Sequence, residues 1–183
     1  MKIYQTLEDR ENPDEIEENG PFLCERKNAW LGPGFYFWEY FIKNAHWWGD
    51  KAYNGKYVIC QATYDDTDKQ KIFDLYSNYE HKDLFVKTIE MMKYYGLFIE
   101  NQTCISTVID FLISKKLFPY DAIKIDGILS KGNSSSKYNF HVICSSNRPS
   151  YVDLIPAVQI CFRKKDVLNL KDYKIIFPEK YIQ

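Results

Sequence analysis

The sequence predicts an α+β fold. Strand patterns outnumber helical ones, the helical patterns stand in segregated runs, and the last third of the chain is rich in β-forming residues. The 183 residues are enough to bury a full core, and neither an internal repeat nor a linker divides them. We therefore expect a single domain that spans residues 1–183.

The chain is expected to begin with a strand and a short helix. Apolar residues predict the strand over residues 2–7. Asn12-Pro13 combines a helix-capping residue with proline at the first helical position. Asn19-Gly20 is typical of a helix end. A loop over residues 21–29 then leads to a turn that contains two glycines.

Strands are next expected over residues 35–38 and 57–64, which are rich in aromatic and apolar residues. Between them, one apolar stripe predicts a helix over residues 39–49, with Phe41, Ala45 and Trp48 on the stripe. Trp48 and the preceding tryptophan are assigned to the core. Asn54-Gly55 predicts a turn.

The second half is expected to hold two helices and several strands. Ser77 is a capping residue for a helix that extends to about residue 95. Residues 103–117 are the clearest helix, because their apolar residues recur at helical spacing. The strands expected in this half cover residues 71–76, 122–125, 139–145, 157–162 and 173–177.

A glycine turn followed by an aromatic strand occupies residues 30–39. Gly32 and Gly34 let a ligand approach the main chain closely. Alternation sends Tyr36 and Trp38 to one face and the neighbouring phenylalanines to the other. A flat ligand ring could therefore stack on Tyr36. The alternative is a tight turn that leads into an ordinary core strand.

Composition excludes several function classes. The net charge of −1 gives no sign of a bulk nucleic-acid footprint, and Arg163, Lys164 and Lys165 are the candidates for a local basic patch. The five cysteines are scattered without a Cys-x-x-Cys pair, which argues against a zinc site and favours a reducing compartment. We find no signal peptide and no apolar run long enough to span a membrane. A cytoplasmic protein, or an effector delivered into a cell, is expected, with no metal cofactor and no membrane partner.

Three short anchors follow one another along the chain: Tyr4-Gln5-Thr6 with Ile16 and Gly20 after it, Gly32-x-Gly34-Phe35-Tyr36-Phe37 with Ala45 and Trp48-Gly49 after it, and Tyr120-Asp121-Ala122 with Val158-Gln159-Ile160-Cys161-Phe162 after it. In this order they resemble the ADP-ribosyltransferase-like family, which includes poly(ADP-ribose) polymerases, diphtheria-toxin-type enzymes and many small bacterial proteins of unassigned role. In that family the first strand often reads Tyr-His-Gly-Thr, and a Gly-x-Gly-x-Tyr-Phe strand comes later. A late strand carries Glu, less often Gln or an apolar residue.

The resemblance implies a split β-sandwich with flanking helices and a cleft that binds NAD as a substrate. Tyr36 would stack on the positively charged nicotinamide, close to the backbone of Gly34. The main chain near Thr6 would bind the carboxamide. Gln5 stands where the family often has His and would contact the adenosine-side ribose. Gln159 would touch the nicotinamide ribose, so that Gln159 and Tyr36 are the catalytic candidates.

The glutamine on the late strand bears directly on catalysis. Cleavage of the glycosidic bond builds positive charge on the ribose, which a carboxylate stabilises. The neutral amide of Gln159 supplies no full negative charge. Glu39 and Asp126 are therefore alternative carboxylates.

Three functions stay open from the sequence. The first is transfer of ADP-ribose from NAD to a protein or nucleotide acceptor. The second is a non-catalytic module on the same scaffold that binds NAD, a nucleotide or a protein partner. The third is a domain in which the aromatic run is only core.

Overall fold

The computed structural model describes residues 1–65, 71–127, 137–138, 140–144, 146, 151–166 and 169–182. It combines one large sheet with helices, which confirms the predicted α+β class. The strands are β1 (Lys2–Glu8), β2 (Phe35–Glu39), β3 (Tyr57–Tyr64), β4 (Ile72–Asp74), β5 (Ala122–Asp126), β6 (His141–Ile143), β7 (Tyr151–Asp153), β8 (Val158–Phe162) and β9 (Leu170–Phe177). The helices are α1 (Pro13–Asn19), α2 (Ile42–Tyr53), α3 (Tyr79–Tyr94), α4 (Ile105–Ser114) and the 3₁₀ helix η2 (Glu179–Tyr181).

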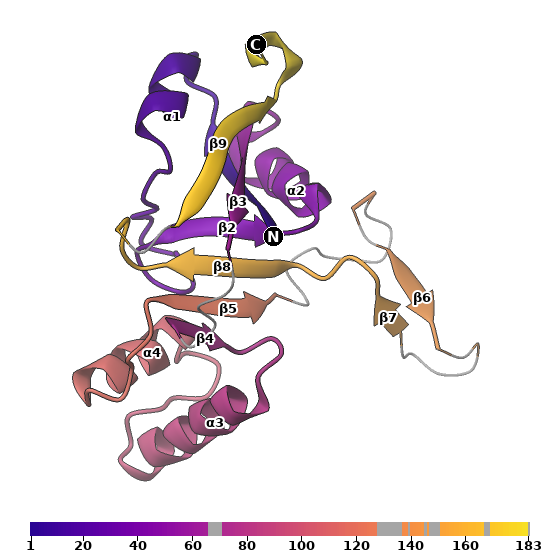
Figure 1. Cartoon of the computed structure of the whole chain (residues 1–183). Helices are drawn as coiled ribbons and strands as arrows, with labels where there is room; N and C mark the ends of the chain where they lie inside the picture. Colours follow the sequence, from indigo (N-terminus) through magenta and orange to yellow (C-terminus); the bar gives the residue numbers. More distant parts are fainter. Residues whose placement is uncertain are drawn as a thin grey trace.

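The large sheet has the strand order β4-β5-β8-β2-β1-β3-β9. Its neighbours are antiparallel except β4 and β5, which are parallel. In Figure 1, β2, β8 and β5 run across the view, whereas β3 and β9 run steeply across them. The sheet therefore turns sharply near its middle, where β2 meets β1. The small β6–β7 hairpin projects away from this body.

The two faces of β2 pack differently, as alternation predicts. Phe35 and Phe37 belong to a core cluster with Ile3 of β1 and Phe162 of β8. Trp38 points the other way and packs with α2. Tyr36 also lies on that second face, in the cluster that α4 covers. The prediction that Tyr36 and Trp38 share one face is confirmed.

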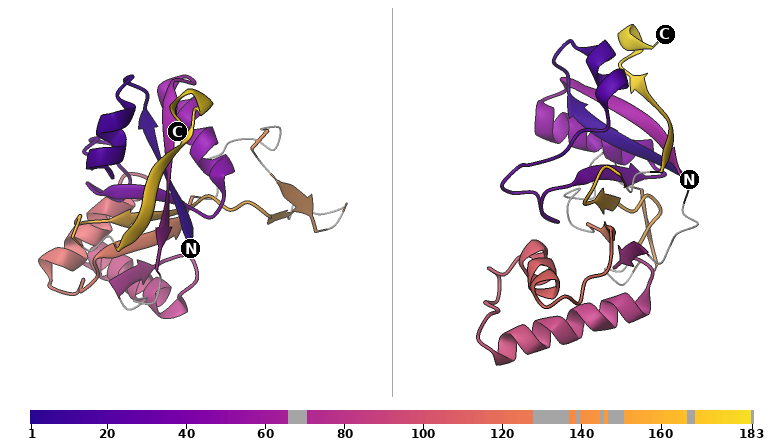
Figure 2. Two further views of the ribbon diagram at one scale, coloured as in Figure 1. Left: turned by 45° about the horizontal axis from the view of Figure 1, so that its top comes forward. Right: turned by 60° about the vertical axis from the view of Figure 1, so that its left-hand side comes forward.

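The helices divide between the two ends of the sheet. Helices α3 and α4 lie together below β4 and β5, and α1 and α2 lie at the end where β3 and β9 stand (Figures 1 and 2). Ile109 and Leu112 of α4 pack on Phe73 and Ile123, which explains the strong apolar spacing of this helix. Within the described residues, none of the helices is both long and apolar enough to cross a bilayer.

The second helix was predicted over residues 39–49 and lies at Ile42–Tyr53, so that prediction was wrong in its position. Glu39 is the last residue of β2, and Tyr40 has a positive φ of 60° that separates the strand from the helix. The helix continues to Tyr53 because Asn54 supplies a left-handed cap (φ 52°, ψ 40°).

Strand β7 was not predicted from the sequence. The strand expected over residues 139–145 corresponds to β6 at His141–Ile143, and residues 139 and 145 lie outside the described part of the chain. β7 is short and half-exposed, so its pairing with β6, rather than an apolar run of its own, defines it.

Candidate functional site

The large sheet opens between β1 and β2. β1 pairs with β3 along its whole length. On its other edge, β1 pairs with β2 only through Ile3–Glu39 and Tyr4–Trp38. The two strands then separate, and the start of β2 is bonded instead to the preceding loop. Cys24 N donates to Gly34 O at 2.8 Å, and Gly34 N donates to Cys24 O at 3.2 Å.

After this separation, the main chains of β1 and β2 face each other without the hydrogen bonds of a strand pair. Opposite residues of an antiparallel pair alternate between hydrogen-bonded and non-hydrogen-bonded. Lys2 O accepts from Tyr40 N at 2.9 Å, so every second residue of β1 directs its N–H and C=O toward β2. Thr6 and Tyr36 would form a hydrogen-bonded pair if the ladder continued, but it stops before them. The peptide groups of Thr6 and Tyr36 therefore face the opening.

A cavity of about 580 Å³ lies at this opening, a size common for ligand sites. It brings together Gln5 and Thr6 of β1, Tyr36 of β2 and Gln159 of β8. The sequence-predicted site residues thus converge, with one exception, which is Gly34. The tryptophans at positions 30, 38, 47 and 48 also line the cavity.

Tyr36 contributes a ring to the cavity wall and a hydroxyl to the glycine turn. Its hydroxyl accepts from Leu31 N at 3.1 Å and donates to Gly32 O at 2.6 Å. The pKa of Tyr36 is raised above its ordinary value, mainly by burial and secondly by the neighbouring Cys161 thiol. The hydroxyl therefore stays protonated. The hydroxyl is thereby committed to the turn, and the ring is what Tyr36 offers to a ligand.

Cys161 of β8 is paired with Tyr36 and packs in the same cluster, and it is not among the residues that line the cavity. Burial raises the pKa of its thiol to about 12. The thiolate is the nucleophilic form of cysteine. Cys161 is therefore an inert core side chain at neutral pH and not a nucleophile.

Gln159 is fixed by an indole from the turn that precedes β2. Trp30 Nε1 donates to Gln159 Oε1 at 2.7 Å. Indole nitrogen is only a donor, so the oxygen of the amide must face Trp30. Within the described part of the chain, Gln159 Nε2 has no protein partner, and the residue lines the cavity. Gln159 therefore presents an N–H donor to the cavity rather than the acceptor that a glutamate would present.

Gln5 and Thr6 differ in the hydrogen-bonding groups that they leave available to a ligand in the cavity. The Gln5 amide uses both lone-pair positions of its oxygen but only one of its two N–H groups. Its Nε2 donates to Phe22 O at 2.9 Å, and its Oε1 accepts from Phe22 N at 3.1 Å and Tyr173 Oη at 2.8 Å. The predicted contact with a ribose would have to use the second N–H of Nε2. The Thr6 hydroxyl donates to Ala45 O at 3.0 Å, so Thr6 offers its main chain to the cavity.

Gly34 does not line the cavity, and its lack of a side chain serves packing. A Cβ atom at Gly34 would lie 2.3 Å from Cys161 Sγ and 2.8 Å from Phe162 O. The close approach that the sequence predicted at Gly34 is thus made by β8 and not by a ligand.

Gly34→Ala is expected to lower the free energy of unfolding by about 2 kcal/mol, because the clash with a main-chain carbonyl cannot be relieved by a rotamer change. Urea denaturation of the variant checks this. Gly32→Ala measures backbone strain without a clash, since a Cβ atom at Gly32 would have no neighbour within 4 Å but the φ of 82° disfavours alanine; it is expected to cost about 1 kcal/mol. A Gly34→Ala protein as stable as the parent would contradict the packing argument.

The alternative carboxylates lie away from the cavity. Glu39 Oε1 is 2.7 Å from Lys124 Nζ, and both side chains are largely buried. Neither Glu39 nor Asp126 is among the residues that line the cavity. The carboxylates that do line it are Glu8, Glu15 and Glu25. Sequence reasoning missed these three residues, because they belong to a strand end, a helix and a loop with no motif around them.

Sequence reasoning also assigned no site role to Trp30, Trp48 and Arg26, which line the cavity. Part of the signal was present, because the predicted helical stripe placed Trp48 on the face that packs toward the sheet. The approach of Trp30 to Gln159 spans 129 residues and has no local signature.

No protein-family model matches the chain, and neither a curated protein nor a solved structure matches it.

Proposed function

We propose that this protein binds NAD in the cavity between β1 and β2 and transfers ADP-ribose from it on an ADP-ribosyltransferase-like scaffold. The observation that carries the proposal is the interrupted ladder, in which the peptide groups of Thr6 and Tyr36 face a cavity that the Tyr36 ring also lines. Buried peptide groups need hydrogen-bond partners. A planar carboxamide has one C=O acceptor and one NH2 donor group. The C=O would accept from the N–H of Thr6, and the NH2 would donate to the C=O of Thr6.

The side chains around the opening fit a ligand with a flat cationic ring. The Tyr36 ring provides an aromatic face, which attracts a cation through its quadrupole. Gln159 Nε2 would donate to a ribose hydroxyl oxygen. Gln5 has a positioning role in this arrangement, since it bonds the main chain of Phe22 and so fixes the loop beside the cavity.

The neutral Gln159 limits the rate of the reaction. NAD supplies a glycosidic bond whose cleavage leaves positive charge on the ribose. The amide of Gln159 cannot balance that charge as a carboxylate does. Transfer by this chain is therefore slow. Glu15 and Glu25 are the cavity carboxylates that would supplement Gln159, since Glu8 is paired with Arg10.

Tyr36→Ala is expected to weaken NAD binding about tenfold, because the variant lacks the ring that stacks on nicotinamide. Tyr36→Phe, the matched control, keeps the ring and loses only the hydroxyl bonds to the turn. It is expected to bind NAD within about threefold of the parent. Calorimetric titration of each folded variant checks both values. Unchanged NAD binding by Tyr36→Ala would exclude this cavity as the nicotinamide site.

The second candidate function is a non-catalytic module that binds NAD or a nucleotide. The orientation of Gln159 favours it, because the amide presents a donor and no negative charge. Incubation of the purified protein with NAD separates the two functions. Nicotinamide release at the rate of buffer alone, together with NAD binding, would assign the protein to the module class.

A further inference from the structure

Arg26 is a cavity cation for which the described residues provide no carboxylate partner. Of the described cationic residues that line the cavity, Arg10 is neutralised, because its Nε and Nη2 both lie 2.9 Å from Glu8 Oε2. Arg26 lies over two rings of α2 instead. Its guanidinium carbon is 4.9 Å from the centroid of the Tyr53 ring and 5.9 Å from that of Trp48. No carboxylate in the described part of the chain forms an ion pair with it.

The aromatic contacts hold Arg26 in place without consuming its donors. A guanidinium over an aromatic face retains its N–H groups for other partners, and its planar fork matches the oxygens of phosphate. Holding the side chain on Tyr53 and Trp48 also reduces the ordering cost of binding. An arginine in this state is suited to bind an anion.

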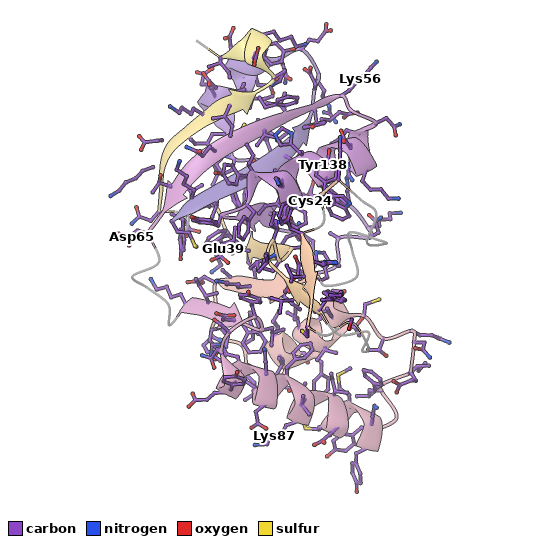
Figure 3. The ribbon with its side chains drawn as sticks, turned by 90° about the vertical axis from the view of Figure 1, so that its right-hand side faces the viewer. Cys24, Glu39, Lys56, Asp65, Lys87 and Tyr138 are labelled. Carbon is purple, nitrogen blue, oxygen red and sulfur yellow. The ribbon has the colours of Figure 1, made fainter. Side chains whose placement is uncertain are left out.

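The loop that carries Arg26 is anchored on both sides of it. Before Arg26, Gln5 bonds the main chain of Phe22, and Cys24 is paired with Gly34. After Arg26, Trp30 bonds Gln159. Figure 3 shows Cys24 near the middle of the molecule. These bonds hold the loop beside the cavity, and the exposed Arg26 side chain lies there on the rings of Tyr53 and Trp48.

We propose that Arg26 recognises a phosphate group of the ligand, so that the cavity selects phosphorylated nucleotides over the corresponding nucleosides. This rests on the proposed function in taking the ligand to be NAD. Glu15 and Glu25 also line the cavity and oppose an anion. The phosphate is therefore expected on the donors of Arg26, beside the rings of Tyr53 and Trp48.

The test compares NAD, nicotinamide riboside and inorganic pyrophosphate by calorimetric titration of the full chain at fixed ionic strength. The parent protein is expected to bind NAD at least about tenfold more tightly than nicotinamide riboside. Arg26→Ala is expected to weaken NAD and pyrophosphate binding about tenfold and to leave nicotinamide riboside within about twofold. Lys27→Ala is the matched control, since it removes a charge from the same loop outside the cavity wall.

The outcomes separate the two proposals. If Arg26→Ala weakens the binding of NAD and of nicotinamide riboside equally, or weakens neither, Arg26 only stabilises the loop. The phosphate proposal then fails, while the proposal that the protein binds NAD stands. If pyrophosphate binds in an Arg26-dependent manner but NAD does not bind, the proposed function fails and the phosphate site stands. If the folded parent binds neither NAD nor pyrophosphate, both proposals fail. A thermal melt of each variant verifies that it is folded.

Discussion

Gln159→Glu is expected to raise the rate of nicotinamide release from NAD about a hundredfold, or roughly 3 kcal/mol of transition-state stabilisation. The glutamate would keep the bond that Trp30 Nε1 now donates to Gln159 Oε1. Its second oxygen would face the cavity, where the glutamine now presents an N–H donor. This places a negative charge where positive charge develops on the ribose.

The rate gain depends on the charge and on its orientation. Gln159→Ala is the control for cavity volume and should show no gain over the parent. Trp30→Phe in the Gln159→Glu background keeps an aromatic ring but removes the orienting N–H. This double variant is expected to release nicotinamide about tenfold more slowly than Gln159→Glu alone. Nicotinamide release is measured by chromatography at saturating NAD. A folded Gln159→Glu protein that binds NAD but releases nicotinamide no faster than the parent would rule out a ribose beside Gln159.

Removing one partner of the Glu39–Lys124 pair is the substitution with the largest expected effect on stability. Glu39→Leu is expected to lower the free energy of unfolding by about 3 kcal/mol, because it leaves a buried ammonium without its carboxylate. The two side chains are 11% and 17% exposed, and the Oε1–Nζ distance is 2.7 Å. Figure 3 shows Glu39 midway between Lys56 at one end of the molecule and Lys87 at the other.

The matched variant is the double substitution Glu39→Leu with Lys124→Met. It replaces both charges by apolar groups of similar size, so most of the lost stability should return. Denaturant titration of the single and double variants measures this. Nicotinamide release per folded molecule should be the same in Glu39→Leu as in the parent, since Glu39 does not line the cavity. A selective loss of release would restore Glu39 as the catalytic carboxylate.

Local patterns predicted the elements that form the site and the direction of their side chains. Alternation along residues 35–38 placed Tyr36 and Trp38 together, and the structure agrees. The prediction failed at the start of α2, where Tyr40 adopts a left-handed backbone conformation that a tyrosine rarely takes. At this residue Tyr40 N donates to Lys2 O at 2.9 Å, a contact with β1 that the apolar spacing does not encode.

The roles of the two glutamines could not be read from their neighbours in sequence. Gln5 and Gln159 are similar in the sequence, since each stands on an apolar strand. In the structure the Gln5 amide makes three bonds to Phe22 and Tyr173, whereas among the described residues the Gln159 amide bonds only Trp30, which leaves its NH2 group for the cavity. The distinction depends on groups that are far away along the chain.

The sequence by itself determined the α+β class, most strands and helices, and the face of β2 that carries Tyr36, because side-chain periodicity acts over a few residues. Only the tertiary structure decided that β1 and β2 separate after Tyr4 and Trp38, that Trp30 meets Gln159, and that Glu39 is paired with Lys124. These contacts join segments up to 129 residues apart. They follow from the order and twist of the strands, which depend on how the whole core packs and which no local pattern contains.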